Sequence, residues 1–156
     1  MVNKQPHIVI IEDDIAFNKL LASYLSSKGF NHVASFYSGE EYIQKMDTRP
    51  DIVLQDFDLP GINGVETMKK IKEKYPRSTF IFLSGQTNLT IAVDAMKQGA
   101  YDYIVKNAFA KEDALNKIKN VAFIEKIQDD KKMYKYTLLI IIFALITSWI
   151  LFLFLK

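Results

Sequence analysis

The stretch HIVIIEDD, residues 7–14, contains the pattern that decides the fold. The run from His7 to Ile11 is apolar and rich in β-branched side chains, which favours a strand buried on both faces. Three acidic residues, Glu12, Asp13 and Asp14, follow the run directly. Because this strand has no polar alternation, we expect it to lie inside a parallel sheet that is covered by helices on both sides.

The same alternation of short apolar runs and helical segments continues along the chain. We expect strands at residues 7–11, 31–36, 51–54, 79–83 and 101–105. The segments after them space their apolar residues as helices do, with Ser38 as the cap of the second helix and Gly29 and Gly99 ending the first and the fourth. Five strands alternating with five helices predict an α/β fold with a five-stranded, doubly wound parallel sheet.

Functional groups in such a sheet gather beyond the C-terminal ends of the strands. Those ends carry, in chain order, Glu12, Asp13, Asp14, Asp56, Asp58, Ser84, Gly85 and Lys106. Asp14 also suits the simpler role of a helix N-cap. Clustered carboxylates suit Mg²⁺, and a lysine and a hydroxyl beside them can hold the oxygens of a phosphoryl group. We therefore expect Mg²⁺-dependent phosphoryl transfer onto an aspartate.

The composition argues against several other kinds of chemistry. The chain has no cysteine, which excludes disulfides, thiolate metal sites and cysteine nucleophiles. Its two histidines, His7 and His32, both flank apolar runs, so we expect neither a histidine metal site nor a Ser-His-Asp triad. The formal net charge is only +2, so no broad basic surface for nucleic acid is expected.

Residues 136–155, YTLLIIIFALITSWILFLFL, form an uncharged and almost wholly apolar stretch. At about 1.5 Å per residue, a helix of this length spans the hydrocarbon core of a bilayer. The alternative, a buried helix of a soluble domain, would keep a polar stripe, which this stretch lacks. We therefore expect a transmembrane helix at 136–155, a basic juxtamembrane linker or helix extension at 126–135, and one globular domain at 1–125. The lysines of the linker place the globular domain in the cytoplasm by the positive-inside tendency.

Four stretches of this chain resemble the receiver domain of bacterial two-component response regulators. They are IVIIEDD (residues 8–14), DIVLQDFDLPGINGVE (51–66), FLSGQ (82–86) and GAYDYIVK (99–106). Their order and spacing match together. The resemblance implies a CheY-like, flavodoxin-like fold and a role in a phosphorelay. It also implies a signalling domain rather than an enzyme, whose own reactions are self-phosphorylation and autodephosphorylation.

The resemblance assigns the phosphoacceptor and the metal ligands. Asp56 would accept the phosphoryl group and would also bind Mg²⁺. Asp13 would be the direct metal ligand, and Glu12 would act through water. The backbone carbonyl of Asp58 would be a further ligand.

The resemblance also assigns the groups that contact the phosphoryl oxygens. Lys106 would bind them, and Ser84 would turn its hydroxyl toward them with help from the amide of Gly85. Tyr103 would be the aromatic switch that moves inward with Ser84. Its simpler interpretation is a half-buried strand tyrosine.

Two positions depart from the family pattern. Asn107 follows Lys106 where the family usually has a proline, which leaves the isomer of this peptide bond open. Glu12 replaces the commoner aspartate. The side chains of Asp58 and Gln86 flank the phosphorylation site, at positions that tune dephosphorylation in this family.

The resemblance implies partners as well. The phosphoryl donor would be a histidine kinase or a phosphotransfer protein. The bilayer, a membrane protein and a second copy of the chain are further expected partners, and nucleic acid is not. We expect no output domain after the last helix, so the signal would leave through the surface of the receiver itself.

Two alternatives stay open at this point. The chain could be a phosphorylation-independent scaffold, which the substitution Asn107 favours and the intact acidic set opposes. The pair Asp56 and Asp58, followed by Ser84 and Lys106, also resembles the scheme of haloacid-dehalogenase-like phosphatases. In that family, however, the paired aspartates open the domain, whereas here another acidic pair comes first.

Overall fold

The protein is described by a computed structural model that covers residues 5–85 and 89–154. Gln86, which was expected beside the phosphorylation site, and Leu155, the last residue of the apolar stretch, lie outside the described residues. Strands and helices alternate throughout. They are β1 (Ile8–Ile11), α1 (Ile15–Ser27), β2 (Val33–Phe36), α2 (Gly39–Lys45), β3 (Ile52–Asp56), α3 (Gly64–Lys74), β4 (Thr79–Ser84), α4 (Leu89–Lys97), β5 (Asp102–Val105) and α5 (Ala110–Phe154).

The five strands form one parallel sheet in the order β2-β1-β3-β4-β5. The order reverses between β1 and β3, so the carboxyl ends of these two strands lie beside the crevice where such sheets bind their ligands. The predicted doubly wound α/β fold with five parallel strands is confirmed.

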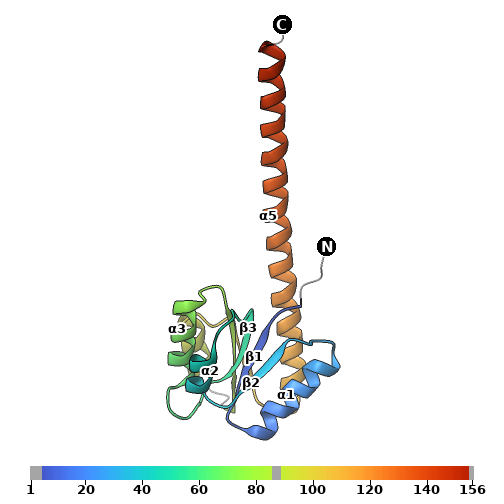
Figure 1. Cartoon of the computed structure of the whole chain (residues 1–156). Coiled ribbons are helices and arrows are strands. Elements are labelled where there is room, and N and C mark those ends of the chain that lie inside the picture. Colours follow the sequence, from blue (N-terminus) through green and yellow to red (C-terminus); the bar gives the residue numbers. More distant parts are fainter. Residues whose placement is uncertain (1–4, 86–88, 155–156) are drawn as a thin grey trace. The chain divides into compact units, whose positions relative to one another are not determined.

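Alternate residues of the buried strands face two separate hydrophobic clusters. One cluster packs α1 and the first part of α5, which lie on the same face of the sheet (Figure 1), through residues such as Ile10, Leu21 and Ile118. The other packs α2, α3 and α4 on the opposite face through residues such as Val53, Met68 and Ala95. Because both faces are covered, β1 and β3 read as continuous apolar runs rather than as alternating ones.

Two strands run further than their apolar stretches predicted. β3 continues to Asp56 and β4 to Ser84, whereas the apolar runs stop at Leu54 and Leu83. The neighbouring strands extend the ladder, because Asp56 pairs with Leu83 and the amide of Phe57 donates to the carbonyl of Leu83 at 2.8 Å. The candidate acceptor Asp56 is therefore the last residue of β3, whereas it was expected beyond the end of this strand.

The beginnings and ends of the helices follow local sequence signals. The Asp14 side chain caps α1 by accepting hydrogen bonds from the amides of Ala16 and Phe17, and Ser38 caps α2 in the same way. Gly29 follows α1 with a φ of 91°, a left-handed conformation that glycine adopts without strain. These predicted boundaries are confirmed. β2 is shorter than expected because its ladder with β1 begins only at Val33.

The chain divides into two compact units, one through Val121 and one from Ala122 onward. The helix α5 contributes to both, since it begins at Ala110 and ends at Phe154. It contains the predicted linker, 126–135, which is helical, and the described part of the stretch 136–155. By length and composition alone, it is the one helix among the described residues that could cross a membrane. The domain boundaries at 125 and 135 stay predictions.

Gly64, the first residue of α3, should tolerate no side chain. A Cβ there would lie 2.6 Å from the carbonyl oxygen of Asp56 and 3.0 Å from that of Phe57, and backbone atoms cannot rotate away. We expect Gly64→Ala to lower the free energy of unfolding by about 1–3 kcal/mol. Urea unfolding of the full chain in detergent micelles measures this change.

Gly85 supplies the matched control for this substitution. A Cβ at Gly85 meets no atom within 4 Å, so Gly85→Ala should leave stability nearly unchanged. Equal unfolding curves for the two variants would contradict the close approach at Gly64.

Candidate functional site

Lys106, which follows β5, reaches acidic side chains at the ends of two other strands. Its Nζ donates to Asp56 Oδ2 at 2.7 Å and to Glu12 Oε1 at 2.8 Å, and it lies 2.7 Å from Glu12 Oε2. The Glu12 and Asp56 side chains are buried. The Lys106–Asn107 peptide bond is trans.

A third carboxylate completes an acidic cluster at the same edge. The candidate ligand atoms of Glu12, Asp13 and Asp56 all lie within 4.8 Å of one another. The Asp13 side chain is exposed, whereas the other two are buried. The expectation that acidic residues from the first and third strands meet at one edge of the sheet is confirmed.

The electrostatics of the cluster are dominated by burial and by the shared lysine. The pKa of Glu12 is raised to about 7, mainly by burial; the hydrogen bond from Lys106 opposes this rise, and the nearby charge of Asp56 adds to it. Burial alone would lower the pKa of Lys106. The hydrogen bonds to Asp56 and Glu12 outweigh this effect, so the pKa of Lys106 lies above its ordinary value. Lys106 is therefore a stable cation at neutral pH.

Asp58 and Ser84 lie on the other side of Asp56. The backbone amide of Asp58 donates to Asp56 Oδ1 at 3.1 Å, so each oxygen of the Asp56 carboxylate has a donor. The hydroxyl of Ser84 lies 3.4 Å from Asp58 Oδ2, and Ser84 is fully buried. Gly85, which follows β4, is exposed. The structure thus brings the hydroxyl of Ser84 close to Asp58, which follows the candidate acceptor Asp56.

Tyr103 on β5 lies in an aromatic cluster beside the site. Its ring is half-buried and contacts the ring of Phe57 edge-on, with 6.4 Å between the centroids. Phe57 in turn contacts Phe82 edge-on at 5.6 Å. Because Phe57 directly follows Asp56, this cluster joins the candidate acceptor to the candidate switch residue. The inward movement of Tyr103 stays a prediction.

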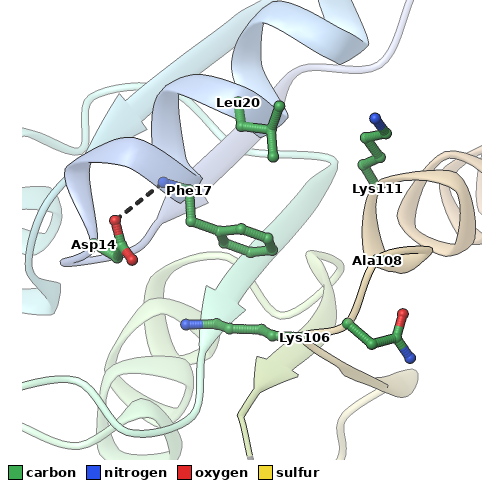
Figure 2. Close-up of a pocket in the computed structure, with 7 residues that line it drawn as sticks. Asp14, Phe17, Leu20, Lys106, Ala108 and Lys111 are labelled. Atoms are coloured by element: carbon green, nitrogen blue, oxygen red, sulfur yellow. Dashed lines mark hydrogen bonds between the residues drawn. The ribbon is translucent and has the colours of Figure 1, made fainter.

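A cavity of about 360 Å³ opens beside Lys106 (Figure 2). Phe17 forms one wall, and the Lys106 ammonium lies 5.3 Å from the centroid of its ring, which is a cation–π contact. Asn107 lies on the other wall, and its side-chain oxygen accepts a hydrogen bond from the amide of Phe109 at 2.8 Å. Asn107 therefore fixes the start of α5 at the position where the family pattern has a proline. The remaining lining residues are Asp14, Leu20, Ala108 and Lys111.

Sequence reasoning missed three residues that support the site. Phe17 and Asn18 lie in the first turn of α1 and contact Lys106 and the end of β1, respectively. Glu40 on α2 accepts a hydrogen bond from the amide of Ile62 at 2.8 Å and so holds the loop after β3. The only signal in the sequence was that each residue lies about one turn after the end of a strand. This position did not reveal the contacts, because the partners are distant in sequence.

Comparison with known proteins decides the family. The sequence profile of the response regulator receiver domain matches residues 8–119. The chain belongs to this family. Family membership makes this part of the chain a receiver domain of two-component response regulators, and it disfavours the phosphatase alternative.

The chain matches nearly the whole of some relatives and only a small part of others. The chemotaxis protein CheY of Thermotoga maritima is 32% identical over 114 residues, which are 70% of this chain and 95% of CheY. The DNA-binding transcriptional regulator NtrC of Klebsiella pneumoniae is 34% identical over 98 residues, which are 62% of this chain but only 21% of NtrC. The chain thus spans about a fifth of NtrC.

Solved structures agree with this assignment. The CheY-like response regulator receiver domain protein of Methanospirillum hungatei has a TM-score of 0.72 and 25% identity, over 80% of this chain and 99% of that one.

Glu12 should make the metal-free receiver less stable as the pH rises. Its pKa is about 7 in the folded protein and 4.5 for the free side chain, so the folded state binds more protons between these values. Stability should therefore fall from about pH 4.5 to about pH 7, by on the order of 1–3 kcal/mol. Urea unfolding of the full chain in detergent and EDTA measures the slope.

The isosteric variant Glu12→Gln isolates this contribution, because its side chain does not titrate. We expect its stability to fall less steeply over the same interval. Parallel curves for the two proteins would show that Glu12 titrates normally.

Proposed function

We propose that this chain is a membrane-anchored receiver that accepts a phosphoryl group on Asp56 in the presence of Mg²⁺. The observation that carries the proposal is the position of Lys106, whose ammonium group joins Asp56 on β3 to Glu12 at the end of β1. A lysine that contacts the acceptor oxygen can also hold the incoming phosphoryl oxygens.

The charges of the site fit a divalent cation. Glu12, Asp13 and Asp56 together oppose a single contacting ammonium, that of Lys106. When all are ionised the cluster is doubly negative, which one Mg²⁺ neutralises. Oxygen donors that retain water suit this ion. Asp13 and Asp56 would bind it directly, Glu12 through water, and Asp58 through its carbonyl oxygen.

When bound, Mg²⁺ would neutralise charge on the phosphoryl oxygens during transfer. An oxygen of Asp56 attacks phosphorus, and the bond from phosphorus to the donor breaks, so the donor leaves with the electron pair of that bond. Lys106 binds one phosphoryl oxygen, and the hydroxyl of Ser84 and the amide of Gly85 bind another. The amide of Asp58 already donates to Asp56 Oδ1, which leaves this carboxylate oriented before the donor arrives.

The remaining parts of the proposal concern switching and partners. Ser84 turns toward the phosphoryl group, and Tyr103 follows it inward past Phe57, which changes the surface of α4, β5 and α5. The donor is a histidine kinase or a phosphotransfer protein. The domain is a phosphoacceptor rather than an enzyme that acts on other substrates. A second copy of the chain, which the family resemblance suggests, and a membrane protein, which the apolar span suggests, are further proposed partners.

The membrane anchor rests on the second compact unit. Residues such as Ile140, Phe143 and Trp149 each have about two-thirds of their surface exposed, and the sequence places no charge between Tyr136 and Leu155. Exposure of large apolar side chains on all sides of a helix is costly in water and favourable in lipid. The lysines at 126, 131, 132 and 135 place the receiver on the cytoplasmic side.

Phosphorylation of Asp56 is testable by intact mass. The full chain in detergent micelles, given Mg²⁺ and acetyl phosphate, should gain one phosphoryl group, and Asp56→Asn should abolish this gain. Asp51→Asn is the matched control, because Asp51 is also buried next to β3 but lies at the opposite end of the strand. Unmodified wild-type protein would support the phosphorylation-independent scaffold instead.

Membrane anchoring is testable by carbonate extraction of membranes. The wild-type chain should stay in the membrane fraction. Arginines at Ile141 and Leu145 should release it, because each costs about 2.5–3.5 kcal/mol at the centre of a span. Ile124→Arg, on the same helix but outside the predicted span, should stay bound. Retention of the doubly substituted chain would contradict the anchor.

A further inference from the structure

Asn18 is a fully buried amide in the first turn of α1 that contacts the ends of two strands. Its Nδ2 donates to the carbonyl of Glu12 at 3.1 Å and to the carbonyl of Phe36 at 2.9 Å. Both neighbours are carbonyl oxygens, which only accept, so the donor nitrogen of the amide must face them. The two hydrogens of one NH₂ group therefore join the end of β1 to the end of β2.

This contact holds the peptide that carries the candidate metal ligand. The carbonyl of Phe36 also accepts the amide of Glu12 at 3.1 Å, so both peptide groups of Glu12 are hydrogen-bonded. The second of them is the Glu12–Asp13 peptide. Asn18 thereby sets the plane of this peptide and with it the direction in which the Asp13 side chain leaves the backbone.

The Asp13 side chain depends on this support more than its neighbours do. Glu12 and Asp56 are positioned by their ion pairs with Lys106. Within residues 5–85 and 89–154, the exposed Asp13 carboxylate makes no hydrogen bond or ion pair. Before a cation binds, the backbone sets the point from which this side chain starts, and no hydrogen bond or ion pair within the described residues holds its oxygens.

Packing alone does not account for an amide at this position. The Oδ1 of Asn18 has no hydrogen-bond partner among the described residues, although the side chain is buried. A half-satisfied buried amide contributes less to stability than an apolar side chain of similar volume. What Asn18 provides, and a leucine of similar volume would not, is the two hydrogen bonds to the ends of β1 and β2.

We propose that Asn18 is a positioning residue that preorganises Asp13 for Mg²⁺. This inference rests on the proposed function, because it concerns the same metal site. Residues that orient a metal ligand without touching the ion affect metal affinity strongly. Asn18 acts through the Glu12–Asp13 peptide, and it contacts neither the ion nor the phosphoryl group.

The test separates positioning from stability. In Asn18→Leu, of similar volume and without donors, the dissociation constant for Mg²⁺ should rise about tenfold, measured by titration calorimetry on the full chain in detergent micelles. Leu21→Val is the matched control, because Leu21 is buried on the same helix but faces the core. Leu21→Val should lower the Tm and leave the Mg²⁺ affinity of the folded protein unchanged.

The Mg²⁺ dependence of the phosphorylation rate tests the same distinction between positioning and stability. With acetyl phosphate as donor, Asn18→Leu should need about tenfold more Mg²⁺ for half-maximal phosphorylation, yet should reach the wild-type rate at saturating Mg²⁺. Asn18→Ala serves as a second variant if the leucine disturbs folding, and circular dichroism reports the fold of each.

The outcomes distinguish this inference from the proposed function. If wild-type protein binds Mg²⁺ and both Asn18 variants bind it equally well, the role of Asn18 is wrong and the receiver function stands. If Leu21→Val weakens Mg²⁺ binding as much as Asn18→Leu does, the effect is one of stability and the inference is overturned. If the wild-type protein binds no Mg²⁺, both proposals fail.

Discussion

The ion pairs between Lys106 and the buried carboxylates of Glu12 and Asp56 are the constraint on which the rest of the site depends. Carboxylates removed from water need a compensating charge, and the strand ends provide one ammonium for two of them. This contact joins the ends of β1, β3 and β5, which are far apart in sequence. It also leaves the cluster negative when all three carboxylates are ionised, and a divalent cation would neutralise that residual charge.

The backbone around this charged centre is held by contacts that carry no charge of their own. Asp14 caps α1, Asn18 joins the ends of β1 and β2, and the missing side chain of Gly64 lets α3 start against the carbonyl of Asp56. The ring of Phe17 contacts the ammonium group of Lys106. In the proposed function, preorganisation of this kind would let the same few side chains hold a cation and a phosphoryl group without rearranging the sheet.

Much of this arrangement could be predicted from residue patterns. Short β-branched runs followed by acids identified the strands, and the rule for parallel sheets brought Asp13, Asp56 and Lys106 to one edge. The strand ends were less accurate, because hydrogen bonding from neighbouring strands extends β3 and β4 past their apolar runs. Asn18 and Glu40 escaped prediction, since a polar residue on a helix carries no local sign of which distant backbone group it contacts.

The sequence by itself determined the kind of fold, the types of residue at each strand end and the long apolar stretch at 136–155, because these depend on composition and on spacing along the chain. Only the tertiary structure decided which oxygen faces which donor. Lys106 pairs with Glu12 and Asp56, and the side-chain amide of Asn18 on α1 donates to the carbonyl of the peptide before Asp13. Such contacts join residues far apart in the chain, so they follow from how helices pack on the sheet and not from any local pattern.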